Sequence, residues 1–311
     1  MTALSMTSCG GNNENEISIS GAFALNPFVI KCADGYMKLH PEVKIDVSQG
    51  GAGKGVTDVL ANQVDLGMVS REIRPEETKG GAFAIAVVKD AVVPTVNADN
   101  PALAALLEKG LTREAAYRLW VKQDLKTWGE LLGTANDAPI NVYTRSDACG
   151  AAETWALWFD SRQEDLGGTA VNGDPGLAKA VQDDVNGIGF NNIGYAYDEN
   201  TRKPHAKLAI LPIDVNGNGR IDAEERIYDT KDQLVEAIAQ GLYPAPPARD
   251  LYLVSNGKPK KEVVIDFLRY VLTEGQQFSK EAGFVTLEED KIHRGLQSIA
   301  VAEQDEVKAE N

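Results

Sequence analysis

Short apolar runs alternate with segments of helical periodicity along most of this chain. The runs that predict buried strands are residues 17–19, 43–47, 85–88, 91–94, 140–143 and 208–213. Apolar positions three and four apart predict helices at 102–109 and 113–121, and we expect further helices at 125–132, 151–159, 177–185, 261–272 and 276–282. The alternation predicts an α/β fold. The acidic segment 288–311 is expected to fray, with at most a short helix.

Three glycine-containing loops follow predicted strands and lead into helical patterns. They are residues 21–27, 49–56 and 145–151. Backbone N–H groups at a helix start have no partner within the helix, and the helix dipole there favours negative charge. The three loops therefore predict an anion-binding site that does not require a positively charged protein.

The loops resemble those of the phosphate-binding periplasmic proteins of ABC importers. The family motifs GSTTVYP, QGxGSGxGV, VDIGxSSR and RxDGSGT are similar to GAFALNP at 21–27, QGGAGKGV at 49–56, VDLGMVSR at 64–71 and RSDACGA at 145–151. Later segments at 187–195, 243–252, 267–277 and 283–285 resemble the family's GAIGYV, YPLxRxLY and closing FL, EGQ and GYVPL motifs. The resemblance runs in order from residue 17 to residue 287.

This resemblance implies an α/β, two-lobed periplasmic-binding-protein fold of type II, with mixed sheets flanked by helices. Lobe one would comprise residues 17–93 and 251–311, and lobe two would comprise 94–250. Two crossing strands near Val93 and Leu251 would form the hinge. The ligand, a small anionic solute, would bind between the lobes, and closure would present the loaded protein to an ABC permease in the membrane.

The resemblance also assigns ligand-binding positions. They are Ala22, Phe23, Ala24, Gly51, Ala52, Gly53, Asp65, Arg145, Asp147, Cys149, Gly150 and Ala151. The family holds phosphate oxygens with side-chain hydroxyls as well as N–H groups, and those hydroxyl positions carry Ala24, Ala52, Cys149 and Ala151 here. Each lost partner of a buried oxyanion costs about 1–3 kcal/mol. We therefore predict a non-standard site, larger than the family norm, that binds inorganic phosphate weakly.

Three positions keep the residue types that the resemblance implies. Arg145 is expected to pair with the anion or to orient Asp147, and Asp65 is expected to accept a hydrogen bond from a protonated ligand. The alternative is a binding module on the same scaffold for a larger ligand or a protein partner, without phosphate binding.

Charge and composition exclude several classes. The 311-residue chain has a net charge of −15, which argues against nucleic-acid binding. Local dipoles and one arginine can still attract an anion, because surface charge is screened within about 10 Å. No apolar run approaches the roughly 20 residues of a membrane span. We expect a monomer with no organic cofactor.

The segment 4–11 resembles the end of a bacterial lipoprotein signal, with Cys9 as the lipidated residue. Eight residues precede Cys9, so we interpret residues 1–16 as a signal remnant and polar tether. Lipidation would anchor the protein to a membrane without spanning it, at the periplasmic or cell surface of a bacterium. The alternative is an incidental cysteine in a tag-like end.

Two other cysteines, Cys32 and Cys149, leave a disulfide open, although it would oppose hinge closure. We interpret Cys32 as a small buried apolar residue. Cys149 stands at a predicted helix start near Arg145, where a thiol pKa is usually lowered, so we expect it to be reactive. A minor alternative is an enzyme with Cys149 as nucleophile, but no histidine lies near it in sequence, and we expect a protein that is not an enzyme.

A second site is predicted at residues 214–225, which match the twelve-residue calcium loop. The ligands would be Asp214, Asn216, Asn218, the Arg220 carbonyl, Asp222 and bidentate Glu225, with Gly219 at the sharp turn. A strand precedes the loop, and no second loop pairs with it, so we expect structural calcium in lobe two. The alternative is an Asn-Gly turn between strands.

Other chemistries fit the sequence less well. Residues 48–55 depart from the nucleotide-binding loop at both ends, since Ser48 replaces its first glycine and Gly55 its hydroxyl residue. The three histidines, His40, His205 and His293, are isolated in sequence. Trp155 and Trp158 are expected to pack in the core, with ligand stacking as the alternative.

Overall fold

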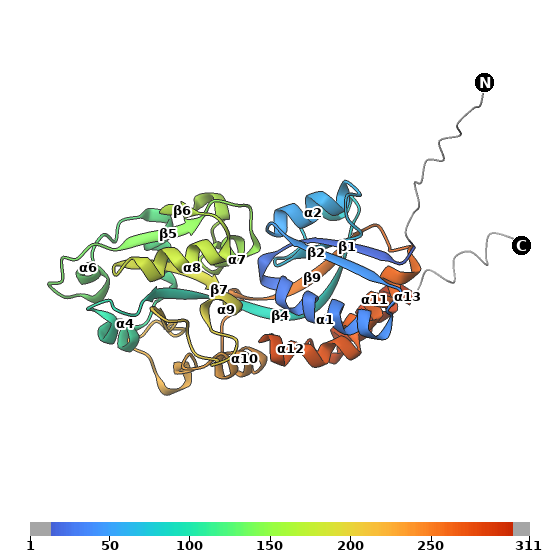
Figure 1. Cartoon of the computed structure of the whole chain (residues 1–311). Helices are drawn as coiled ribbons and strands as arrows, with labels where there is room; N and C mark the ends of the chain where they lie inside the picture. The colour runs from blue at the N-terminus through green and yellow to red at the C-terminus, as the bar shows by residue number, and fades with distance from the viewer. Residues whose placement is uncertain (1–13, 301–311) are drawn as a thin grey trace, which may run out of the picture.

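The computed structural model of the chain describes residues 14–300. Two α/β halves lie side by side, and the long strands β4 and β9 run between them (Figure 1). The described chain begins and ends in the same half, at the outer end where α11 and α13 lie (Figure 1). This arrangement puts the strand ends of both halves at their common boundary.

The strands form a mixed sheet whose path is β2-β1-β3-β9-β4-β7-β5-β6, with β8 beside β4. Strand β1 is parallel to β2 and β3, whereas β9 is antiparallel to β3 and β4. In the other half β5 is parallel to β6 and β7. The strands are β1 (Glu16–Gly21), β2 (Lys44–Gln49), β3 (Leu66–Val69), β4 (Ala82–Asn97), β5 (Asn141–Arg145), β6 (Thr169–Val171), β7 (Gly187–Asn192), β8 (Leu208–Ile210) and β9 (Ala248–Asn256).

Helices cover the strands in both halves (Figure 1). The helices of the N-terminal half and the returning C-terminal segment are α1 (Asn26–Leu39), α2 (Ala52–Leu60), α3 (Pro75–Lys79), α11 (Glu262–Leu272), α12 (Gln277–Ala282) and α13 (Glu289–Ala300). The helices of the other half are α4 (Leu103–Lys109), α5 (Arg113–Tyr117), α6 (Trp128–Leu132), α7 (Gly150–Trp158), α8 (Gly173–Asp183), α9 (Ile193–Ala196) and α10 (Lys231–Ala239).

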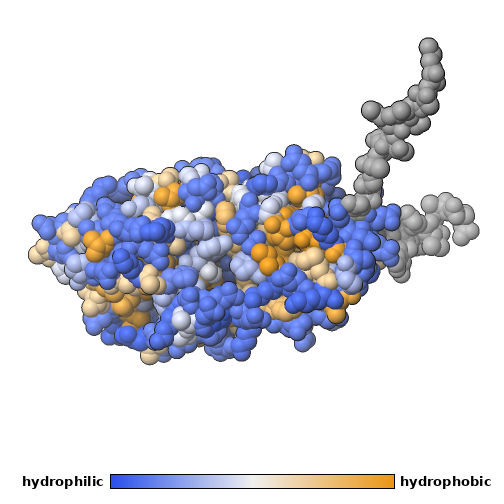
Figure 2. Space-filling view, viewed as in Figure 1, coloured by the Kyte–Doolittle hydropathy of each residue, from blue (hydrophilic) through white to orange (hydrophobic). Residues whose placement is uncertain are grey.

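Buried apolar side chains form one large core in each half. The core of lobe one extends from Ile17 through Val88 and resumes at Leu251, and the core of lobe two extends from Ala91 to Ala248 and includes Val285. The halves therefore meet within β4 and β9, and we call them lobe one and lobe two. Hydrophilic residues cover most of the face shown in Figure 2. Among residues 14–300, no helix combines the length and apolarity that a membrane crossing would need.

Two segments differ from the sequence-based expectation. Residues 85–88 and 91–94 belong to one strand, β4, because the intervening Asp90 pairs in the interior with Arg249 of β9. The chain after residue 288 does not simply fray, since α13 packs Ile299 into the lobe-one core. Its apolar residues recur at helical spacing, which favours an amphipathic helix on that surface. Residues 301–311 lie outside the described part of the chain.

Candidate ligand-binding site

The predicted loops come together at the boundary between the lobes. In lobe one, β1, β2 and β3 end in the loops at residues 22–25, 50–51 and 70–71. In lobe two, β5 ends at Arg145 and leads through 146–149 into α7. Since the carboxyl ends of parallel strands share one sheet edge, each lobe presents its loops in one place. The structure thus unites loops that lie far apart in the sequence.

Close backbone approach explains two of the glycines. Gly21 has φ of +133°, and a Cβ there would lie 2.3 Å from the Met68 carbonyl oxygen. A Cβ on Gly150 would lie 2.1 Å from the carbonyl oxygen of Ser70, in the opposite lobe. Only glycine permits either contact. The loop after β3 therefore packs directly against the start of α7.

The two lobes are in contact through several polar groups. The Gly53 N–H donates to the Ala148 carbonyl at 3.3 Å, and the Tyr195 hydroxyl donates to the Phe23 carbonyl at 3.3 Å. The Glu153 carboxylate of α7 accepts from Arg74 at 2.7 Å and lies 3.1 Å from Nε of Arg71. These contacts describe a closed arrangement in which some N–H groups of the loops already have protein partners.

Arg145 is the cation at the centre of this site. Its Nε and Nη2 donate to the two oxygens of Asp147 at 2.9 and 2.6 Å, and its Nη1 donates to Asp174 at 2.7 Å. The Phe23 ring of lobe one lies 5.8 Å from the guanidinium carbon. Two carboxylates thus surround one guanidinium that is almost fully buried. The expectation that Arg145 orients Asp147 agrees with this geometry.

The ionisation of Arg145 and Asp147 follows from these contacts. Burial opposes charge on Arg145, but the carboxylates of Asp174 and Asp147 outweigh it and hold the guanidinium pKa above its ordinary value. Burial likewise acts to raise the pKa of Asp147, but its hydrogen bonds and proximity to Arg145 outweigh burial and lower that pKa. Both groups are therefore charged at neutral pH.

The four residues expected at the family's hydroxyl positions are buried. Ala24, Ala52 and Ala151 are all nearly inaccessible, and Cys149 is 5% exposed. The Cys149 sulfur accepts the Ala152 N–H at 3.4 Å and so caps α7. None of these four side chains carries a hydroxyl group.

The expectation that Cys149 has a lowered thiol pKa is wrong. Burial raises the pKa of the Cys149 thiol to about 12, and this outweighs the opposing effect of Arg145. A helix start lowers a thiol pKa most effectively where the sulfur is partly exposed, and Cys149 is buried. Cys32 is buried beside Gly275 in lobe one, and both cysteines are free thiols. The geometry therefore gives no support to a nucleophilic Cys149.

Asp65 does not join the other predicted residues, which corrects its assignment to the ligand site. It precedes β3 at the amino end, where it accepts from the Ser18 N–H at 2.8 Å and the Ser18 hydroxyl at 3.0 Å. Ser70 follows the carboxyl end of the same strand and contacts Gly150. Because β3 lies between them, Asp65 and Ser70 are at opposite ends of this strand.

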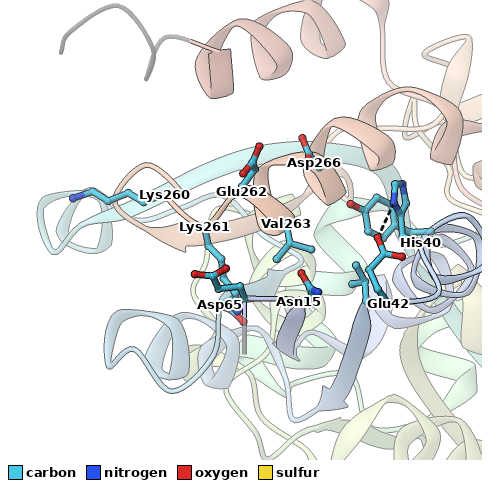
Figure 3. Close-up of a pocket in the computed structure, with 12 residues that line it drawn as sticks. Asn15, His40, Glu42, Asp65, Lys260, Lys261, Glu262, Val263 and Asp266 are labelled. Carbon is cyan, nitrogen blue, oxygen red and sulfur yellow. Dashed lines mark hydrogen bonds and ion pairs between the residues drawn. The ribbon is translucent and has the colours of Figure 1, made fainter. Parts of the chain in front are cut away.

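Asp65 instead lines a cavity of about 710 Å³ on the outer side of lobe one (Figure 3). Lys261 lies beside it, 3.4 Å from its carboxylate, and the charged residues around the cavity have both signs. The His40 ring contacts Glu42 there at 3.5 Å (Figure 3). This cavity is larger than the one between the lobes, but the three loops do not contribute to it.

The inter-lobe cavity has a volume of about 550 Å³ and adjoins the loop at residues 145–151. Its lining includes three arginines, three glutamates and one residue from each of the loops 49–56 and 145–151. These residues are Arg71, Arg74, Arg145, Glu77, Glu153, Glu164, Gly53 and Cys149. The Arg71 guanidinium also donates to Glu77 at 2.8 and 2.6 Å. The cavity therefore suits a polar ligand better than an apolar one.

Sequence reasoning missed Asp174 and Glu153 as parts of the site. The sequence pattern assigns a binding role to neither residue. Neither lies at a spacing from Arg145 that would signal contact, since Asp174 is 29 positions away. The folding of α8 against β5 and β7 brings it there.

The predicted calcium loop folds around its own hydrogen bonds. Asp214 accepts the N–H groups of Gly217, Asn218 and Gly219, at 2.7, 3.2 and 2.7 Å. Glu225 accepts those of Val215 and Asp222, at 2.8 and 3.0 Å. Within residues 14–300, no three histidine, cysteine or acidic side chains are gathered as a metal would need. Calcium at this loop remains a prediction.

The tryptophans of α7 belong to the core of lobe two. Trp155 is fully buried and stacks on Phe190, with ring centroids 5.6 Å apart and planes at 17°. Trp158 is also buried, beside Trp155. Neither lines the inter-lobe cavity.

The predicted lipidation site, Cys9, lies outside the described residues.

Comparison with known proteins assigns the family. The sequence profile of the PBP superfamily domain matches residues 8–274, and the chain therefore belongs to this superfamily. A similar relative is the phosphate-binding protein PstS of Pseudomonas aeruginosa, which is 27% identical, with 92% of this chain and 87% of that protein covered. Its name is that of a binding protein and not an enzyme, in agreement with our expectation.

Solved structures confirm the fold. A phosphate-bound protein from Clostridium perfringens, described among phosphate ABC transporter substrate-binding proteins, superposes with a TM-score of 0.72 at 22% identity, covering 88% of this chain and 100% of that one. An ABC-type phosphate transport receptor from Vibrio cholerae gives 0.62 at 19% identity, covering 87% and 100%. The predicted α/β periplasmic-binding-protein fold with a mixed sheet and flanking helices is confirmed.

Proposed function

We propose that this protein is an extracytoplasmic solute-binding protein that delivers a phosphate-related oxyanion to a bacterial ABC importer, through a non-standard site. The observation that carries the proposal is the meeting of three strand-end loops from two lobes around the buried guanidinium of Arg145. Membership of the PBP superfamily and the names of the similar proteins support the transport role. A lipid anchor at Cys9, a monomeric state and docking on a membrane permease complete the proposal.

The proposal includes weak binding of inorganic phosphate. Alanine at residues 24, 52 and 151 removes three hydroxyl donors, and the geometry leaves Cys149 as a buried cap in place of a fourth. A buried oxyanion with unsatisfied lone pairs loses about 1–3 kcal/mol for each missing partner. Several missing partners reduce affinity by several powers of ten, at about 1.4 kcal/mol for each tenfold.

Restoring the hydroxyls tests this idea directly. We expect Ala52→Ser and Ala151→Ser each to tighten phosphate binding by up to about tenfold, because a net hydrogen bond contributes about 1 kcal/mol. Isothermal titration calorimetry with inorganic phosphate measures the change, and Ala156→Ser, a buried change in the lobe-two core, is the matched control. Submicromolar affinity of the unmodified protein for phosphate would overturn the non-standard site.

A screen of ligands tests the broader function. Thermal-shift measurements with phosphate, sulfate and small organic anions should find at least one anion that raises the melting temperature, since binding only to the folded state stabilises by mass action. If no anion acts, the solute-binding role fails, and the second candidate function becomes the better one.

The second candidate is a binding module on the same scaffold for a larger ligand or a protein partner. One contact favours it: the Gly53 N–H donates to the Ala148 carbonyl. Because this N–H already has a partner within the protein, the loop has one donor fewer for an anion. Pull-down against a purified permease would separate the two candidates, because only the importer function requires that interaction.

A further inference from the structure

Asp174 accepts one of the Arg145 N–H groups that a ligand anion could otherwise use. It stands in the first turn of α8 and is 2% exposed. Its Oδ2 accepts from Arg145 Nη1 at 2.7 Å, while Asp147 takes Nε and Nη2. A guanidinium has five N–H donors, so two remain for any ligand. The carboxylate of Asp174 therefore competes with an incoming oxyanion for the same cation.

The other oxygen of Asp174 is fixed from behind. Its Oδ1 accepts from Asn192 Nδ2 at 2.6 Å and from the Asn192 N–H at 3.4 Å. Asn192 in turn accepts from Arg249, which donates to Asp90 at 3.0 Å and to Thr154 at 3.0 Å. All of these side chains are buried. A displaced Asp174 would leave several buried donors unpaired, which is costly.

We propose that Asp174 is a built-in anion that determines the charge of the ligand. It satisfies Arg145 within the protein, so the cleft excludes dianions and accepts ligands with at most one negative charge. The proposal rests on the proposed function, because it assumes that the cleft beside Arg145 is where the solute binds.

Electrostatics at short range explain the exclusion. A dianion bound near Arg145 would also lie near the carboxylates of Asp147 and Asp174, beside a guanidinium and an Asp174 side chain that are almost fully buried. Like charges within a few ångströms repel strongly when water does not screen them. A nearby charge shifts the pKa of an acid by about 1–3 units, a factor of about 10 to 1,000. We expect a factor of the same order for the binding of a dianion.

The test is a pair of isosteric substitutions. Asp174→Asn removes the charge and keeps the size, while Asp183→Asn on the same helix is the matched control, since Asp183 is exposed and pairs with Lys179. Affinity for inorganic phosphate is measured by calorimetry at about pH 8, where phosphate is mostly a dianion. We expect Asp174→Asn to bind about 10 to 1,000 times more tightly than the unmodified protein and the control to be unchanged.

A double substitution identifies the cause. Adding Arg145→Gln to Asp174→Asn should remove the gained affinity, because the gain depends on the released guanidinium. Melting curves establish that each variant is folded. If Asp174→Asn does not fold, Asp174→Ser serves instead, since its hydroxyl can still accept from Asn192.

The outcomes separate the two proposals. The role of Asp174 is overturned if a folded Asp174→Asn or Asp174→Ser variant binds phosphate no more tightly than the unmodified protein. Tight phosphate binding by the unmodified protein overturns it as well. In both cases the solute-binding function stands if any anion of the screen still stabilises the protein. If no anion stabilises the unmodified protein or either neutral variant, the proposed function fails as well.

Discussion

At the scale of single residues, Cys149 shows how burial changes a side chain's chemistry. Its thiol is a helix cap, and burial raises its pKa to about 12. The thiol is therefore protonated at about pH 8, so we expect alkylation far slower than for an exposed cysteine. Iodoacetamide labelling of a Cys9→Ala variant, followed by peptide mass analysis, measures the rate. Labelling of Cys149 faster than of an unfolded control would contradict the buried geometry.

At the scale of elements, the loop 214–225 is held by N–H bonds to Asp214 and Glu225. A calcium ion would neutralise the carboxylates of this loop, so we expect chelation to lower the melting temperature and calcium to restore it. The stabilisation is about 2.7 kcal/mol at a hundredfold excess over the dissociation constant. Glu225→Gln should abolish the response, and Glu224→Gln, on the neighbouring exposed residue, should not. A melting curve indifferent to chelator and calcium would leave the loop as a turn.

At the scale of the whole molecule, the lobes also meet where α10 and α12 lie side by side (Figure 1). Lys231 of α10 is 2% exposed and donates to the Ala282 carbonyl at 3.0 Å, at the end of α12. Burial, reinforced by Arg202, lowers the pKa of Lys231 to about 8, although Glu199, Asp232 and Asp90 oppose the shift. Charge on this lysine therefore reduces the stability of the closed, folded protein.

The sign of the pH effect follows from proton binding. Between about pH 8 and the unfolded pKa near 10.5, the unfolded chain holds a proton on Lys231 that the folded chain has lost. The contribution of Lys231 to the free energy of unfolding should thus rise with pH across this range, by up to about 3 kcal/mol. Urea unfolding at about pH 7 and about pH 10, compared with Lys231→Met and with the exposed Lys280→Met, measures it. A pH-independent difference between the unmodified protein and Lys231→Met would contradict the shifted pKa.

The sequence alone determined the fold class and the order of the loops, because apolar periodicity, glycines and helix starts are local properties. It also identified Arg145 and Asp147 as neighbours, since they are two residues apart in one loop. The tertiary structure alone decided that Asp174 neutralises Arg145, because the packing of α8 against β5 and β7 creates that contact. It also decided that Asp65 and Ser70 occupy opposite ends of β3 and that Cys149 is desolvated. Distances across the fold and exclusion of water set charge and pKa, and neither is encoded in the spacing of residues along the chain.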